Sequence, residues 1–155
     1  MNVTVHGRTR HFRTVTFDAG RNAVRLIEQR LLPHEFRIVA TRDFRQTARA
    51  ITDMVVRGAG AIGATAAYGL AQGAHAFRGR RLADFQRHMG VVSRALKAAR
   101  PTAVDPANAI HYVSQFMRRG RTIAERQALA LAAAEEFASA DVRHCEAIGR
   151  HGARL

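Results

Sequence analysis

Two segments of helical periodicity meet at Val56-Arg57-Gly58-Ala59-Gly60-Ala61-Ile62-Gly63. On the N-terminal side, apolar residues recur at intervals of four, three and four and so share one helical face: Phe44, Ala48, Ile51 and Val55. Gly58 is predicted to end this helix in a left-handed conformation. The next helix is predicted to begin within residues 59–63 and to run to about Phe77. It has a face of small residues that a neighbouring backbone can approach closely: Ala66, Gly69, Leu70 and Gly73.

The first forty residues follow a pattern typical of short strands. Residues 13–17 and 23–28 are β-compatible runs, and the turn-prone Asp18-Ala19-Gly20-Arg21-Asn22 between them predicts a hairpin. Residues 36–40 offer a third strand after the turn-like Leu32-Pro33-His34. We therefore expect an antiparallel β-meander over residues 1–41.

Three further helices are predicted downstream. The first carries an apolar stripe at three- and four-residue spacing that ends near Arg100-Pro101: Leu82, Phe85, Met89, Val92 and Leu96. Asp105 followed by Pro106 is typical of an N-cap and first-turn proline, and opens a helix with Ala109, Val113 and Phe116 inward. Thr122 with Glu125 fits a capping box at the start of a long Ala-rich helix toward Gly149. The predicted fold class is α+β, with the meander (1–41) and a helical domain (42–155) forming one compact unit.

Composition narrows the classes of function. The 155 residues are 47% apolar and 24% charged, which suits about one globular domain with a sizeable core. The net charge is +13, but all basic residues except Lys97 are arginine and aromatic residues make up only 6%. Short arginine groups near residues 8–13, 78–81 and 118–121 are interpreted as solvated surface, so nucleic-acid binding is disfavoured.

Cellular location is inferred from what the sequence lacks. No run is long and apolar enough to cross a membrane, and the basic N-terminus has no signal-peptide core. The single Cys145 is expected to be a small buried hydrophobic residue. We therefore expect a cytoplasmic protein, and we expect no cofactor. No metal site is expected either, because His144 and His151 lack a third ligand at metal spacing.

The glycine-rich stretch is the strongest candidate site. Gly58, Gly60 and Gly63 spell a dinucleotide-binding pattern, but that pattern requires a preceding strand and here the preceding residues are helical in period. Other features of this stretch favour binding of an anion. A helix start exposes unpaired N–H groups, the helix dipole attracts negative charge, and Arg57 adds a positive charge. A phosphate monoester fits this site, and a tight turn between two packed helices explains the spacing equally well. Arg100 beside Pro101 is a second, weaker candidate.

Several ordered motifs together resemble one family. They are residues 28–33, 50–63, 66–69, 99–104 and 148–153, and they are similar to the N-terminal half of S-methyl-5-thioribose-1-phosphate isomerases. The wider family includes ribose-1,5-bisphosphate isomerase and regulatory subunits of a translation-initiation exchange factor.

This resemblance implies an aldose–ketose isomerase of methionine salvage, which opens the sugar ring of methylthioribose 1-phosphate and moves hydrogen between C1 and C2. The substrate-holding residues it implies are Arg57, Gly58, Ala59 and Arg100. It also implies a catalytic cysteine and aspartate in a C-terminal Rossmann-like half that this chain does not contain, so no catalytic residue is assigned here. The chain departs from the family at Gly60, where a proline is usual, and at Asp105, where an asparagine is common.

Three hypotheses follow. The first is an N-terminal portion that contributes phosphate contacts, is inactive by itself, and pairs with a catalytic half or partner subunit in a homo-oligomer. Its substrate could instead be that of a ribose-1,5-bisphosphate isomerase. The second is a non-catalytic regulatory or assembly module of the same superfamily. The third is nucleic-acid binding through the net charge.

Overall fold

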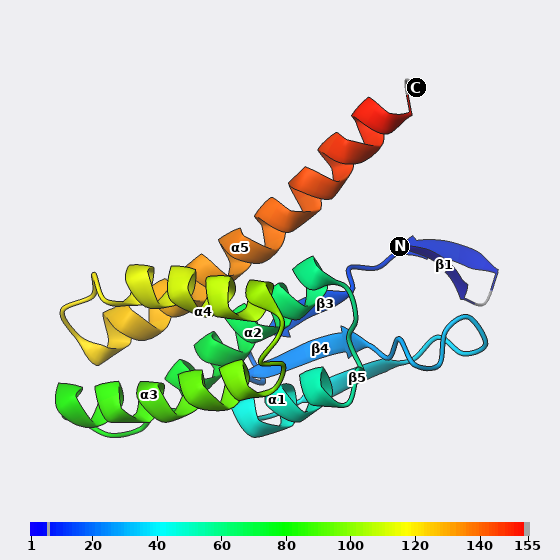
Figure 1. The fold of residues 1–155 in the computed structure, drawn as a ribbon. Helices are drawn as coiled ribbons and strands as arrows, with labels where there is room; N and C mark the ends of the chain where they lie inside the picture. The colour runs from blue at the N-terminus through cyan, green and yellow to red at the C-terminus, as the bar shows by residue number, and fades with distance from the viewer. Residues whose placement is uncertain (6, 154–155) are drawn as a thin grey trace.

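The computed structural model describes residues 1–5 and 7–153, and it is an α+β fold as predicted (Figure 1). The strands among these residues are β1 (Asn2–Val5), β2 (Arg8–His11), β3 (Val15–Asp18), β4 (Ala23–Ile27) and β5 (Ile38–Thr41). The helices are α1 (Phe44–Thr52), α2 (Ala59–Ala76), α3 (Leu82–Ala98), α4 (Val104–Met117) and α5 (Ile123–Gly152).

The predicted meander is present as an antiparallel sheet in the order β3-β4-β5. Its first turn forms as the sequence indicates, because Asp18 Oδ1 accepts a hydrogen bond from the backbone N–H of Arg21 at 3.1 Å and Asn22 adopts a positive φ of 48°. In the centre of the sheet β4 pairs with both neighbours and buries Val24 and Leu26 completely.

A separate antiparallel hairpin, β1 with β2, was not expected from the sequence. The side chains of β2 are all exposed, so the hairpin lacks the alternation of apolar and polar residues by which a half-buried strand is recognised. Figure 1 shows it projecting away from the helices.

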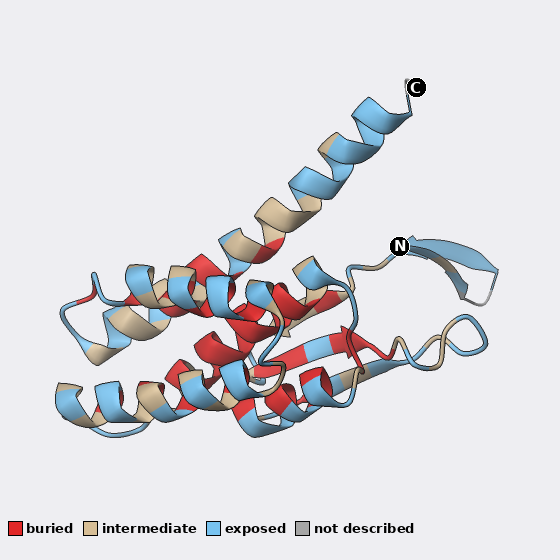
Figure 2. Ribbon diagram, in the orientation of Figure 1, coloured by how far each residue is buried: buried red, intermediate tan, exposed pale blue. Residues whose placement is uncertain are grey.

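The buried centre of the molecule is α2, which contacts all four other helices as well as β3 and β4 (Figure 2). Its small face makes a close contact, as predicted, and the partner is α3. A Cβ added to Gly73 would lie 2.6 Å from Cγ1 of Val92, and one added to Gly69 would lie 2.9 Å from Cδ2 of Leu96. The two glycines therefore allow α3 to approach the backbone of α2 more closely than alanines would.

Two helix boundaries differ from the prediction. The first predicted helix, α1, ends at Thr52, followed by Met54 in a left-handed conformation (φ 60°), and Gly58 is instead the N-cap of α2. Val55 is buried as expected, but it lies beyond the helix end.

The predicted N-cap Asp105 is also wrong, because α4 begins at Val104 after Ala103, and no side chain caps it. Ala109 and Val113 are buried and Phe116 is half-buried, so the predicted inner face is correct. The start of α5 is confirmed: Thr122 Oγ1 accepts from the N–H of Glu125 at 3.1 Å. The Glu125 carboxylate accepts from the N–H of Arg121 rather than that of Thr122, so only half of the capping box forms.

The C-terminal part of α5 extends beyond the other helices (Figure 1). Cys145 lies on this part and is exposed, which corrects the expectation that it is buried. Ile148 is also exposed there. Across residues 1–5 and 7–153, no helix has both the length and the apolar character that membrane crossing requires.

Candidate functional site

The four predicted site residues lie in two loops and at one helix start. Arg57 and Gly58 belong to the loop between α1 and α2, Ala59 is the first residue of α2, and Arg100 lies in the loop between α3 and α4. The side chain of Arg57 is exposed and that of Arg100 is half-buried.

The two loops are in direct contact. The hydroxyl of Thr52 donates a hydrogen bond to the carbonyl of Ala99 at 3.1 Å. Nη1 of Arg100 lies 2.8 Å from Sδ of Met54. Residues far apart in the sequence therefore place the guanidinium of Arg100 against the loop that carries Arg57.

The backbone at Gly58 explains why a glycine precedes α2. Gly58 has φ 88° and ψ 136°, a conformation that glycine adopts easily and side-chain-bearing residues avoid. It is the N-cap and supplies no side-chain hydrogen bond, and the first turn of α2 contains no acidic residue. The first N–H groups of an α-helix have no acceptor within the helix, so this end can donate hydrogen bonds to an anion.

The loop that carries Arg57 is held by the segment after β4. The N–H of Gln29 donates to the carbonyl of Val55 at 2.9 Å, and the side-chain carbonyl of Gln29 accepts from the N–H of Arg57. Nη1 of Arg30 donates to the carbonyl of Asp53 at 3.4 Å. Gln29 is thus a positioning residue for Arg57.

Glu28 anchors this same segment through a two-pronged ion pair. Its carboxylate is buried and accepts from Nε of Arg30 at 2.8 Å and from Nη2 at 2.7 Å. The hydrogen bond with Arg30 lowers the pKa of Glu28 below its ordinary value of 4.5, outweighing the opposing effect of burial. The same hydrogen bond raises the pKa of Arg30.

This ion pair predicts a specific loss of stability in acid. Because the pKa of Glu28 is lower in the folded than in the unfolded chain, its contribution to stability is present above about pH 4.5 and disappears as the pH falls through the folded-state pKa. Urea unfolding at several pH values should show that the stability difference between the wild type and Glu28→Gln shrinks on acidification. The control is Glu35→Gln, which removes the exposed pair with Arg37 and should leave the slope unchanged. Parallel curves for the wild type and Glu28→Gln would contradict the assignment.

Two acidic residues, Asp105 and Asp141, border the first turns of α2, and the sequence analysis did not predict the position of Asp141. A Cβ built on Gly60 would clash with Oδ1 of Asp141, so this side chain of α5 rests directly on the α2 backbone. Asp105 packs near Gly63 in a similar way, with 3.2 Å between its Cβ and the position a Cβ on Gly63 would take. The glycine at position 60 is therefore what leaves room for Asp141.

Helix starts and arginine side chains are groups with which proteins hold phosphate. Here Arg57 adjoins the start of α2, Arg100 lies in the loop that contacts the Arg57 loop, and the Asp141 carboxylate rests on the first turn of α2.

Four carboxylates that could serve as acid or base are dispersed. Asp84 pairs with Arg87 and Glu125 caps α5. Asp105 packs against α2, and Asp53 is the C-cap residue of α1 in the loop that carries Arg57. Among the residues that the structure describes, no three His, Cys, Asp or Glu side chains gather as a metal site.

Comparison with known proteins identifies the family. The sequence profile of the Initiation factor 2 subunit family matches residues 55–155, which is more than half of the chain. The chain belongs to this family. Its members with similar sequences include methylthioribose-1-phosphate isomerases from Methylorubrum populi (41% identical over 94% of this chain and 38% of that protein) and from Roseiflexus castenholzii (42% identical over 93% and 42%).

Solved structures of family members have the same fold. The 5-methylthioribose 1-phosphate isomerase of Pyrococcus horikoshii OT3 superimposes with a TM-score of 0.86 at 32% identity, covering 92% of this chain and 40% of that one. The delta subunit of translation initiation factor eIF-2B from A. fulgidus gives 0.79 at 30% identity, covering 85% and 38%. The chain thus spans about two fifths of the length of these family members.

Proposed function

We propose that this chain is the substrate-phosphate-binding portion of a methylthioribose-1-phosphate isomerase, corresponding to the N-terminal part of such an enzyme. The observation that carries the proposal is the contact between the two arginine-bearing loops beside the uncapped start of α2. The names of relatives at about 40% identity supply the reaction class, isomerisation of methylthioribose 1-phosphate. The product that the family resemblance implies is the corresponding ribulose phosphate.

In this proposal each site residue has a physical role. The N–H groups that follow Gly58 donate to the phosphate oxygens, and the helix dipole favours the dianion. Arg57 and Arg100 donate from two sides, and a planar guanidinium can bind two phosphate oxygens at once. Gln29 fixes the backbone of Arg57, so less freedom is lost when the phosphate binds.

The chemical step is assigned to another segment or subunit. Moving hydrogen between C1 and C2 requires an acid or base within hydrogen-bond reach of the substrate. Asp105, Asp141 and Glu125 have packing and capping roles, and Cys145 lies on the projecting part of α5. We therefore propose that the chain alone binds the sugar phosphate without converting it, and that it works in a homo-oligomer or with a catalytic partner.

Two other functions within the family remain as alternatives. The substrate could be that of a ribose-1,5-bisphosphate isomerase, because Gly60 replaces the usual proline beside the phosphate. A non-catalytic regulatory module is favoured by the similarity to the eIF-2B delta subunit of A. fulgidus. The first alternative predicts binding of a different sugar phosphate at the same arginines, and the second predicts no sugar-phosphate binding at all.

A chimera tests whether this chain binds the substrate while another segment carries out the chemical step. The chain would replace the matching segment of the Roseiflexus castenholzii isomerase, with which it shares 42% identity. The chain alone should give no turnover of methylthioribose 1-phosphate, and the chimera should convert it. A control chimera carrying Arg57→Gln should fold but lose most of its activity.

The possible outcomes separate the hypotheses. Turnover by the isolated chain would refute the assignment of chemistry to another segment. A folded chimera that binds no methylthioribose 1-phosphate but binds ribose 1,5-bisphosphate would favour the first alternative. A folded chimera that binds neither would favour the regulatory module.

A further inference from the structure

A cavity lies between α3, α4 and the start of α5, away from the candidate phosphate site. Its volume is about 320 Å³, which is within the range of small-molecule pockets. It is lined by the C-terminal part of α4, whereas the phosphate-site loop precedes the N-terminal end of that helix. The two sites are therefore at opposite ends of α4.

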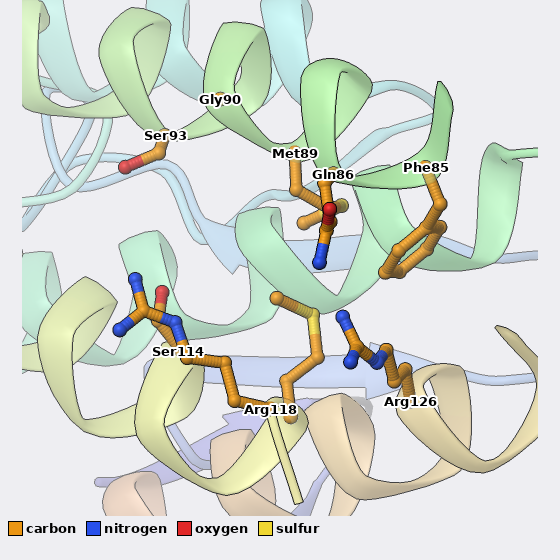
Figure 3. Close-up of a pocket in the computed structure, with 9 residues that line it drawn as sticks. Phe85, Gln86, Met89, Gly90, Ser93, Ser114, Arg118 and Arg126 are labelled. Atoms are coloured by element: carbon orange, nitrogen blue, oxygen red, sulfur yellow. The ribbon is translucent and has the colours of Figure 1, made fainter. Parts of the chain in front are cut away.

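The floor of the cavity is apolar. Phe85, Met89 and Met117 line it and are each almost fully buried. Small residues on the facing helices, Ser93 of α3 and Ser114 of α4, leave the space between the helices unfilled (Figure 3). Methionine side chains adapt their shape readily, so this floor can accommodate short flexible apolar groups.

One wall of the cavity is positively charged. Arg118 and Arg126 both line it, and no acidic residue does. Nε of Arg126 donates to the carbonyl of Gly120 at 2.9 Å, which fixes the guanidinium, and Figure 3 shows its remaining nitrogens directed into the space between the helices. Within the described part of the chain, neither arginine forms an ion pair with a carboxylate.

We propose that this cavity binds a small organic carboxylate with a short apolar chain. The carboxylate pairs with Arg126 and Arg118, and the apolar chain lies on Met89, Met117 and Phe85. Guanidinium groups without a carboxylate partner are suited to bind an anion. The apolar chain of the ligand is stabilised because it leaves water when it lies against the apolar floor. Gln86 on α3, opposite Arg126 in Figure 3, can donate an additional hydrogen bond to the carboxylate.

The four methionines of the chain provide a direct test. The protein would be labelled with ¹³C at the methionine methyl groups and titrated with hexanoate, hexanamide or inorganic phosphate. Hexanoate should shift the methyl resonances of Met89 and Met117 and leave those of Met1 and Met54 unchanged. Hexanamide and inorganic phosphate should each bind at least about tenfold more weakly than hexanoate, because hexanamide lacks the charge and phosphate lacks the apolar chain.

Two variants locate the charge that is responsible. Arg126→Gln should weaken hexanoate binding about tenfold, whereas Arg150→Gln, which removes an equal charge from the exposed end of α5, should not. If Arg126→Gln unfolds, Ser114→Asp places a competing carboxylate in the cavity and should weaken binding similarly. The proposal is overturned if hexanoate and hexanamide bind equally, if no shift occurs at Met89 and Met117, or if Arg150→Gln has the larger effect.

Discussion

Replacing Gln72 with leucine is expected to lower the free energy of unfolding by about 3 kcal/mol, since each buried polar group left without a partner costs about 1–3 kcal/mol. The Gln72 side chain is completely buried. Its Nε2 donates to the carbonyls of Thr41 and Asn22 at 2.8 and 2.9 Å, and its Oε1 accepts from the Thr47 hydroxyl at 2.7 Å. Gln72 therefore ties α2 to the sheet and to α1, and leucine can replace none of these bonds.

The effect is measurable by urea unfolding followed by circular dichroism. Gln115→Leu is a matched control, because Gln115 is exposed on α4 and makes only a long contact with His111. This control should change stability by no more than about 0.5 kcal/mol. Equal stability of the two variants would show that the hydrogen bonds of Gln72 do not hold the sheet on the helices.

The double variant Arg57→Gln/Arg100→Gln is expected to bind methylthioribose 1-phosphate at least about 100-fold more weakly than the wild type, because each charge-assisted hydrogen bond contributes about 1.5–3 kcal/mol. Arg57 is exposed and Arg100 half-buried, so we expect the fold to tolerate both changes. Isothermal titration calorimetry would measure the affinity, and circular dichroism would confirm folding.

A second double variant distinguishes local contacts from the long-range field of a chain with net charge +13. Arg49→Gln/Arg94→Gln removes the same charge from exposed positions on α1 and α3, the helices that precede the two site loops. Its affinity should fall only slightly, and less at higher salt because distant charges are screened. An equal loss in both double variants would contradict specific phosphate contacts by Arg57 and Arg100.

The order of the elements from β3 onward could be predicted because it depends on local patterns. The hairpin of β3 and β4 follows from its turn residues, and α2 and α3 follow from residues that repeat at helical spacing. The predicted start of α4 was wrong. Asp105 with Pro106 has the composition of a helix start, but α4 begins one residue before Asp105, because the chain reaches helical geometry at Val104.

The site was predictable only in part, for a physical reason. Arg57 and Gly58 stay predictions as phosphate-binding residues; the sequence itself indicates only that a positive charge and a glycine adjoin a helix start. Gln29, Gln72 and Asp141 were not predicted, because their roles depend on contacts with segments distant in the sequence. Cys145 was expected to be buried because of its residue type, but it lies on the part of α5 that no other element covers.

The most direct test of the proposed phosphate site is a titration of the ¹⁵N-labelled and methionine-methyl-labelled chain with methylthioribose 1-phosphate, followed by nuclear magnetic resonance. We predict that the amide resonances of Ala59 and Gly60 and the methyl resonance of Met54, which contacts Arg100, shift together with one affinity. The methyl resonances of Met89 and Met117, at the other end of α4, should not move with them. Unchanged resonances at residues 57–61 and Met54 under saturating ligand would contradict the account.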